Sequence, residues 1–512
     1  MQRKVNMKIN RTKNAGKNMV FELMKNLYGV IMPFIIRTAM IHCLGIEYTG
    51  LGGLFSSILD MLNLVELGVG SAMVFSMYKP IAEDDQTTIC ALMRLYKIYY
   101  RVIGIVICSI GLILTPFIDK LISGSCPEGI DVHILFLMNL SVTVLSYWLF
   151  AYRNCLLQAH QQTHYATRMD LGLNIVFSLL QLGSLIVFKN YYIYMLLNIV
   201  RQILSNIIQA LITKKIYPLY VPKGRLEKAK EKDIQRRTKD LFTAKLGNTI
   251  TNSADAIIIS SFLGLTLLAQ YQNYYYIFSA VLGIIGIVYN STRAGIGNSL
   301  VCESIDKNIE DLKLFTFIIM WILTFCVSCF LGLYQTFIGI WIGDKGILPF
   351  GIVICLCIMF VFRYYNCLLM TYKDAAGAWH EDRFRPLIAG VTNLFVNIIL
   401  VQFMGLYGVL ISTILSEGLI EVPWLVINIF RTVFKKSPKE YIKFSIGKLV
   451  VAVVVMAITG IIVNCVPSVG VLWLVIRLCI VILTSNFLLV VVYFKNKYFK
   501  ETIKLAKKMI FK

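Results

Sequence analysis

Charged residues are scarce in this sequence, and acidic residues are scarcer than basic ones. Only 15% of the 512 residues are charged, and 28 Asp and Glu stand against 50 Lys and Arg. Water-soluble globular domains carry about 25% charged residues, whereas 57% of this chain is hydrophobic. This composition excludes a soluble globule and predicts an all-α integral membrane protein that crosses the bilayer many times.

The sequence also lacks the short motifs of soluble catalytic chemistry. It contains no G-x-x-x-x-G-K-[ST] loop, no H-E-x-x-H and no G-x-S-x-G. We therefore expect no enzyme activity and no ATP hydrolysis by that route. Any work that the protein does must draw on an ion gradient, the membrane potential or its substrate.

Metal ligands are sparse as well. Only five histidines are present, and the one local pair, His160 and His164, has no nearby Cys or carboxylate ligand. Most of the 13 cysteines sit in or beside apolar runs, so no disulfide framework is predicted. We expect neither a metal site nor a cofactor.

Long apolar runs are abundant instead. A membrane-spanning helix needs about 20 apolar residues, and we count about fourteen runs of roughly that length. The predicted spans cover residues 19–42, 52–77, 98–118, 133–155, 171–188, 191–212, 247–264, 268–292, 313–336, 347–370, 386–404, 407–430, 446–465 and 470–494.

The distribution of basic residues agrees with this count. Lys and Arg concentrate in every second connection, while the intervening connections are short or weakly charged. Because cytoplasmic loops carry the excess of Lys and Arg, this alternation predicts that both termini lie in the cytoplasm. The net charge of +22 has the same origin, so no nucleic-acid partner is expected.

Short matches between the two halves indicate an internal repeat. Leu44-Gly45 matches Leu263-Gly264, and residues 68–71 match 295–298 with the glycine pairs several residues out of register. We interpret this as two six-helix bundles related by a parallel repeat, plus a C-terminal helix pair. The predicted domains are 1–213 (first bundle), 214–245 (basic cytoplasmic connecting loop), 246–435 (second bundle) and 436–512 (helix pair and basic tail). The helix-compatible part of the basic loop is expected to lie along anionic lipid headgroups.

Polar residues recur on one face in four of the predicted spans, the first, second, seventh and eighth. Ionisable groups at bilayer depth are costly, so such faces normally line a water-filled cavity or meet a partner. We therefore expect these faces to converge on a shared water-accessible chamber. The candidate residues in these stripes are Arg37, Asp60, Asn63, Asn252, Asp255 and Arg293.

The roles of the candidates in these stripes follow from their chemistry. A guanidinium grips phosphate through two parallel hydrogen bonds, so Arg37 is predicted to bind substrate; alternatively it pairs with Asp60 or reaches outward. Arg293 either lines the chamber or follows the positive-inside bias. Asp60 and Asp255 are candidate ion sites, pH-sensitive carboxylates or counter-charges to an arginine.

Two later spans carry further ionisable residues. Arg363 in the tenth span is predicted to line the chamber and bind substrate. Glu417 and Glu421 lie one turn apart in the twelfth span. Two close carboxylates raise each other's pKa, which suits proton coupling or gating, whereas a structural pair with Arg363 is the alternative.

Several short segments resemble those of a known family. They are residues 11–14 (RTKN), 37–38 (RT), 44–51 (LGIEYTGL), 66–72 (ELGVGSA), 78–80 (YKP), 373–375 (KDA) and 382–386 (DRFRP). Over nearly the whole chain, the sequence resembles bacterial polysaccharide-unit flippases. These are the Wzx-like exporters of O-antigen and capsule repeat units in the multidrug/oligosaccharidyl-lipid/polysaccharide (MOP) transporter superfamily.

The resemblance implies a bacterial cytoplasmic membrane protein with a central cationic cavity. Such a protein moves an undecaprenyl-pyrophosphate-linked oligosaccharide to the outer leaflet by alternating access. The resemblance also implies that Arg37 and Arg293 bind pyrophosphate, and that Asp60, Asp255 and Glu417 act in ion coupling or gating. Expected partners are the lipid-linked oligosaccharide, membrane lipids and the polysaccharide polymerase machinery.

Three other functions stay open at this point. A cation-coupled multidrug exporter of the same superfamily would have a carboxylate-rich cavity, and a lipid II-type flippase would carry a related lipid-linked substrate. A non-transporting scaffold for glycan polymerisation would leave the polar stripes unexplained.

Overall fold

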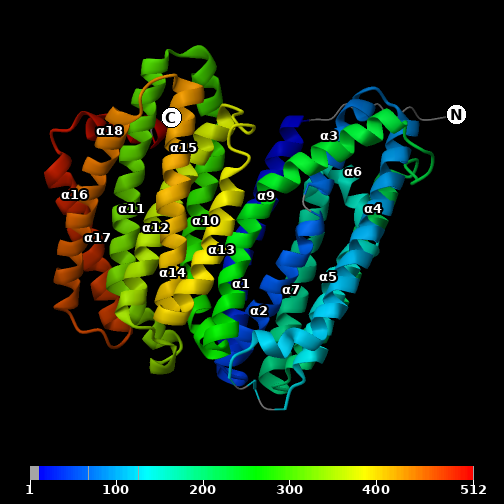
Figure 1. The fold of residues 1–512 in the computed structure, drawn as a ribbon, viewed down its shortest axis with the longest axis horizontal. Coiled ribbons are helices and arrows are strands. Elements are labelled where there is room, and N and C mark those ends of the chain that lie inside the picture. The colour runs from blue at the N-terminus through cyan, green and yellow to red at the C-terminus, as the bar shows by residue number, and fades with distance from the viewer. Residues whose placement is uncertain (1–10, 67, 125, 128, 511–512) are drawn as a thin grey trace. The chain divides into compact units, whose positions relative to one another are not determined.

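The protein is helical throughout its described part. The structure, a computed structural model, describes residues 11–66, 68–124, 126–127 and 129–510. All regular elements in these ranges are helices, which confirms the predicted all-α class. Residues 1–10, at the predicted cytoplasmic N-terminus, lie outside the described residues. The chain divides into two compact units, Met1–Ala269 and Gln270–Lys512 (Figure 1), here called unit 1 and unit 2.

Unit 1 is built from nine α-helices and three short 3₁₀ segments within the described residues. These are α1 (Arg11–Cys43), α2 (Ile46–Leu62), η1 (Asn63–Glu66), α3 (Val69–Ala82), α4 (Gln86–Leu114), η2 (Thr115–Leu121), α5 (Val132–Trp148), η3 (Ala151–Arg153), α6 (Asn154–Ala159), α7 (Thr163–Val187), α8 (Tyr191–Ile216) and α9 (Lys228–Leu263). Helix α7 packs between α1 and α8, α4 packs on α5, and α9 packs on α2.

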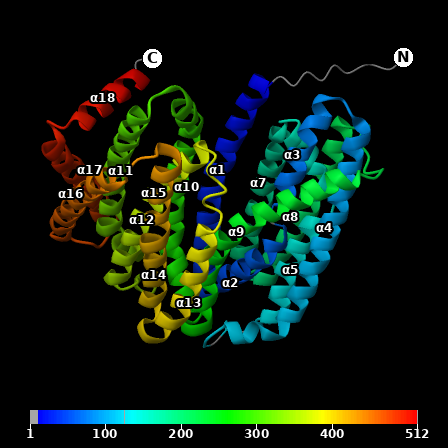
Figure 2. The ribbon, with the colours of Figure 1, turned by 45° about the horizontal axis from the view of Figure 1, so that its top comes forward.

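Unit 2 holds most of α10 and the helices that follow it. These are α10 (Leu265–Cys302), α11 (Ile305–Trp341), η4 (Asp344–Gly346), α12 (Phe350–Ala375), α13 (Arg385–Met404), α14 (Leu406–Leu415), the π-helix η5 (Ser416–Glu421), α15 (Val422–Ile429), the π-helix η6 (Phe430–Phe434), α16 (Lys439–Asn464), α17 (Val471–Tyr493) and α18 (Lys497–Ile510). Helix α11 packs on α12, α16 and α17, and α18 turns away from α17 (Figure 2).

Eleven helices of the described residues are long and apolar enough to cross a membrane, and the number becomes twelve if the pair Val132–Trp148 and Ala151–Ala159, bent by 44°, is one span. Two predicted spans are not among them. The span 52–77 is broken where η1 follows α2 and Gly68 takes a φ of 96°. The span 247–264 forms the second half of α9, where polar residues such as Asn252 and Asp255 lower its hydropathy.

Residues 228–245 of the predicted connecting loop are helical and form the first half of α9. The predicted domain boundaries remain a prediction.

Helix α4 begins directly after an acidic turn formed by residues 83–85. Asp85 caps the helix, because its carboxylate accepts the backbone N–H of Thr88 at 3.0 Å. The hydroxyls of Thr87 and Thr88 donate to the same carboxylate at 2.6 and 2.5 Å. These hydrogen bonds hold the pKa of Asp85 well below its ordinary value, so the cap keeps its charge at neutral pH.

One intramembrane arginine that the sequence analysis did not single out ties α17 to α11. Arg477 on α17 is 6% exposed. Its guanidinium donates to the carbonyl of Gly332 on α11 and to the carbonyl of Pro467, both at 3.0 Å. Backbone carbonyls are partners for an arginine in a bilayer, so Arg477 has a structural explanation.

Glycines turn the chain sharply at two corners. Gly45 (φ 126°) separates α1 from α2, and Gly264 (φ 90°) separates α9 from α10. These are the two positions that the sequence repeat pairs, and a positive φ is accessible to glycine at little cost. The corners are close together in unit 1: a Cβ added at Gly50 would lie 2.3 Å from the carbonyl oxygen of Leu265. The α2 backbone therefore touches the first turn of α10.

Replacing Gly50 by Ala is expected to lower the free energy of unfolding by about 1–3 kcal/mol, because the new methyl group can be accommodated only if backbone moves. The matched control is Gly172→Ala on α7, where nothing lies within 4 Å of the added Cβ and helix propensity improves. Thermal unfolding of both variants in one detergent checks the contact. Equal melting temperatures for the two variants would contradict it.

Candidate functional site

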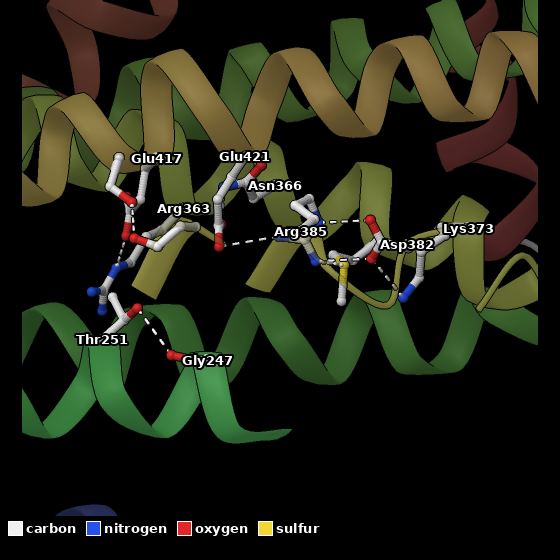
Figure 3. Close-up of polar contacts among 12 residues, drawn as sticks. Gly247, Thr251, Arg363, Asn366, Lys373, Asp382, Arg385, Glu417 and Glu421 are labelled. Carbon is white, nitrogen blue, oxygen red and sulfur yellow. Dashed lines mark hydrogen bonds and ion pairs between the residues drawn. The ribbon is translucent and has the colours of Figure 1, made fainter. Parts of the chain in front are cut away.

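A row of charged side chains connects α12, the turn after it, α13 and η5 (Figure 3). Opposite charges alternate along the row, and each charged group has a counter-charge within 3.3 Å. The cations are Arg293, Arg363, Lys373 and Arg385, and the anions are Asp374, Asp382, Glu417 and Glu421. The row is therefore neutral overall, which is the arrangement that makes charge tolerable away from water.

Arg363 and Glu417 form the ion pair that links α12 to η5. The Nε of Arg363 lies 2.6 Å from Oε1 of Glu417, with side-chain exposures of 15% and 6%. The Nη1 of Arg363 donates to the hydroxyl of Tyr275, and the guanidinium lies 5.6 and 5.8 Å from the ring centroids of Tyr275 and Phe278. The structural pair that the sequence left open for Glu417 is therefore present.

Glu417 and Glu421 lie on a distorted turn. They occupy η5, a π-helical segment inserted between α14 and α15. Pro423 follows this segment and has no amide hydrogen to offer the carbonyl of Leu419 one turn earlier, so regular α-helical bonding is interrupted there. Single π-helical turns of this kind occur frequently at functional sites. In this distorted segment the two carboxylates lie beside arginines of the neighbouring helices α12 and α13.

The second half of the row centres on Arg385, the first residue of α13, which is 2% exposed. It holds Asp382 through two parallel hydrogen bonds, Nε to Oδ1 at 2.8 Å and Nη2 to Oδ2 at 3.1 Å. Its Nη1 lies 3.1 Å from Oε1 of Glu421, whose other oxygen accepts from Asn366 at 2.9 Å. Arg385 therefore bridges the turn before α13 and the π-helix.

Lys373 and Arg293 complete the row. The Nζ of Lys373 lies 3.3 Å from Asp382 and 3.0 Å from Asp374. Asp374 in turn lies 3.1 Å from Nη2 of Arg293 on α10. The side chain of Arg293 is 47% exposed, so it is the one member of the row with a large accessible surface.

The structure brings four of the nine predicted site residues into this row: Arg293, Arg363, Glu417 and Glu421. The other five lie in unit 1. There Arg37 and Asn63 are half-buried, Asp60 and Asn252 are exposed, and Asp255 is 5% exposed.

The sequence analysis missed Lys373, Asp382 and Arg385 as site residues. They lie in the two segments of unit 2 that carry the family resemblance, residues 373–375 and 382–386. The available signal was the acid–base spacing of Asp382 and Arg385 just before Pro386, where α13 begins. The alternation of basic connections along the sequence instead places this stretch in a cytoplasmic connection.

Metal ligands do not cluster in the described residues: no group of three His, Cys, Asp or Glu there is placed to hold a metal ion. His160 is 3% exposed and its ring lies 4.4 Å from that of Tyr217, centroid to centroid. This histidine packs in the core of unit 1.

A bundle of long apolar helices with paired charges inside it is the architecture of a multi-pass membrane protein. The structure is similar to that of lipid II flippase MurJ in an inward closed conformation, with a TM-score of 0.65 and 14% identity over 93% of this chain and 99% of that chain. It is also similar to an inward-facing multidrug resistance MATE family transporter of the MOP superfamily, with a TM-score of 0.60 and 15% identity over 82% of this chain and 99% of that one. The chain therefore has the fold of MOP transporters.

The family comparison classifies the chain more specifically than the fold does. It belongs to the polysaccharide biosynthesis protein family, whose model matches residues 15–293. Among curated proteins, none matches it by sequence. Family and fold together make the chain a multi-pass membrane transporter and not an enzyme, in agreement with the predicted family and with a location in the cytoplasmic membrane.

Replacing Asp382 by Asn is expected to lower the free energy of unfolding by about 3–5 kcal/mol, because Arg385 and Lys373 would lose a buried counter-charge. The control is Glu83→Gln, which breaks an exposed pair with Lys79 whose side chains are 83% and 58% exposed and which should matter little. Equilibrium unfolding in mixed detergent compares the two. A small and equal loss in both variants would show that the row does not stabilise unit 2.

Proposed function

We propose that the protein is a flippase that translocates an undecaprenyl-pyrophosphate-linked oligosaccharide repeat unit across the cytoplasmic membrane, by alternating access, for surface polysaccharide biosynthesis. The observation that carries the proposal is the family match over residues 15–293. The fold shared with a lipid II flippase supports a lipid-linked substrate. The polymerase machinery that uses such units is the proposed partner.

We further propose that the chain crosses the membrane fourteen times. The two segments to add to the twelve apolar ones are α2 with η1 and α3, and the second half of α9. Ser253, Asp255 and Ser260 of α9 are all at most 5% exposed, so protein covers the polar groups that would be costly against lipid. An even number of crossings puts both termini on one side, and the basic tail favours the cytoplasm.

Arg37 of unit 1 and Arg293 of unit 2 are each proposed to bind pyrophosphate. Arg37 on α1 is half-buried, with its Nη2 nitrogen shielded from solvent. Arg293 has one counter-charge, Asp374, and is nearly half exposed, so it can also contact a ligand. Arg363 is held by Glu417 and Tyr275, and a role for it in binding requires that pair to open.

The carboxylates are the proposed groups for coupling or gating. Glu417 and Glu421 each hold an arginine, so protonation or cation binding at either one would weaken a link between α12 or α13 and the π-helix. Asp60 and Asp255 are the corresponding candidates in unit 1. Asn63 and Asn252 are proposed to contact the substrate.

Vesicles that contain the purified protein should expose a labelled lipid-linked glycan to an impermeant reagent faster than protein-free vesicles do. Arg37→Ala is expected to slow this exposure at least about ten-fold, because charge-assisted bidentate contacts to phosphate are strong, and Arg37→Lys should slow it less. Arg101→Ala on the exposed face of α4 serves as the control. Full activity of Arg37→Ala would remove Arg37 from the proposed site.

The same vesicles distinguish the two transporter classes that share this fold. A sodium or proton gradient applied to them shows whether transport is ion-coupled. A cationic dye is the second cargo. Dye transport without glycan exposure would replace the flippase proposal by a multidrug exporter.

A further inference from the structure

Unit 1 contains a polar cavity that none of the nine predicted site residues lines. Its volume is about 420 Å³, and helices α1, α6, α7 and α8 supply its wall. A second cavity of about 250 Å³ adjoins it, because both are lined by Asn154, Gln158 and Gln209. Ligand pockets in proteins usually measure about 300–1,000 Å³. Together the two cavities therefore have room for a small organic ligand rather than a single ion.

The three shared residues present amide groups that the protein does not use. Asn154 and Gln158 lie one turn apart on α6, and Gln209 lies on α8. Within the part of the chain that the structure describes, their side-chain amides form no hydrogen bond to another protein group. An amide group both donates and accepts hydrogen bonds, and so does a hydroxyl group. A wall of such amides complements a ligand that carries several hydroxyls.

The charged groups of the larger cavity exclude a simple ion as the preferred ligand. Glu22 and Asp170 face the same space as Lys25. An inorganic anion would meet two carboxylates there, and a metal cation would meet the ammonium group. Asp170 accepts a hydrogen bond from Ser205 at 2.8 Å, which orients the carboxylate. A neutral ligand with both donors and acceptors can use all three charged groups.

Tyrosine rings line the smaller cavity. Tyr96 and Tyr100 lie 4.2 Å apart between ring centroids, and Tyr147 meets Tyr100 edge-on at 5.3 Å. The hydroxyl of Tyr100 donates to Glu66 at 3.1 Å. Tyrosine combines an apolar ring with a polar tip. These tyrosines therefore add phenol oxygens, which can accept hydrogen bonds, to the wall of amides.

We propose that this cavity binds a sugar ring of the carried glycan. The proposal rests on the proposed flippase function, since it names the part of the substrate that unit 1 recognises. The α6–α7 connection carries Arg153 and Arg168 on either side, a basic pattern that the positive-inside rule places in the cytoplasm. The cavity wall formed by α6 then lies on the side where the lipid-linked glycan is assembled.

Binding of two lipids to the full-length protein in lipid nanodiscs tests this inference. One probe is the lipid-linked glycan extracted from the native membrane, and the other is undecaprenyl pyrophosphate without sugar. The wild-type protein should bind the glycan-bearing lipid at least about ten-fold more tightly. Gln158→Met with Gln209→Met should remove this preference, because two neutral hydrogen bonds correspond to roughly a ten-fold difference in affinity. The affinity of this double variant for the bare lipid should stay within about two-fold of the wild-type value.

Control variants and melting temperatures distinguish the loss of cavity contacts from unfolding and from a failure of the proposed flippase function. Gln402→Met changes an exposed glutamine on α13 and should keep the preference, and melting temperatures verify that all variants are folded. If the double variant melts early, Gln158→Met alone, at an exposed position, gives the same comparison. A preference retained by the folded cavity variants, or equal binding of both lipids by the wild type, overturns the sugar site alone. Binding of neither lipid by the wild type overturns the flippase proposal itself.

Discussion

The need to neutralise charge away from water governs unit 2. A bilayer supplies no counter-ions or water to a buried ionisable group, so protein must supply both the opposite charge and the hydrogen bonds. The row from Arg293 to Glu417 meets this need by alternation, because each member lies within 3.3 Å of an opposite charge. Arg477 shows the other solution, in which backbone carbonyls replace the missing acid. Both solutions fix the helices that carry the charges.

This constraint also explains where the helices of unit 2 depart from regular geometry. A straight α-helix through residues 416–423 would meet Pro423, whose ring interferes with the carbonyl one turn back. The π-helix η5 absorbs that interference and carries Glu417 and Glu421 to Arg363 and Arg385. Local distortion and charge pairing thus depend on each other. A proline beside two carboxylates was the visible sequence signal for both.

Much of the fold was predictable, because burial against lipid leaves long apolar runs that composition alone reveals. The convergence of the polar stripes on one chamber stays a prediction. The break at Gly68 and the burial of polar groups in α9 could not be predicted in this way, because both depend on contacts within the protein. Lys373 and Asp382 escaped prediction for a different reason. Pairing between a helix end and a turn depends on tertiary contacts that no periodicity encodes.

The two units therefore differ in what their polar interiors can do. In unit 2, counter-charges within the protein already occupy the buried members of the charged row, and a ligand can compete for those only by opening a pair, whereas Arg293 is 47% exposed. In unit 1, the amides of Asn154, Gln158 and Gln209 face a cavity and keep their hydrogen-bonding capacity. Satisfied networks hold a structure in one state, whereas unused donors and acceptors favour recognition. Under the proposed flippase function, the amides of unit 1 are therefore suited to selecting among glycans, and the paired carboxylates of unit 2 are suited to responding to ions or protons.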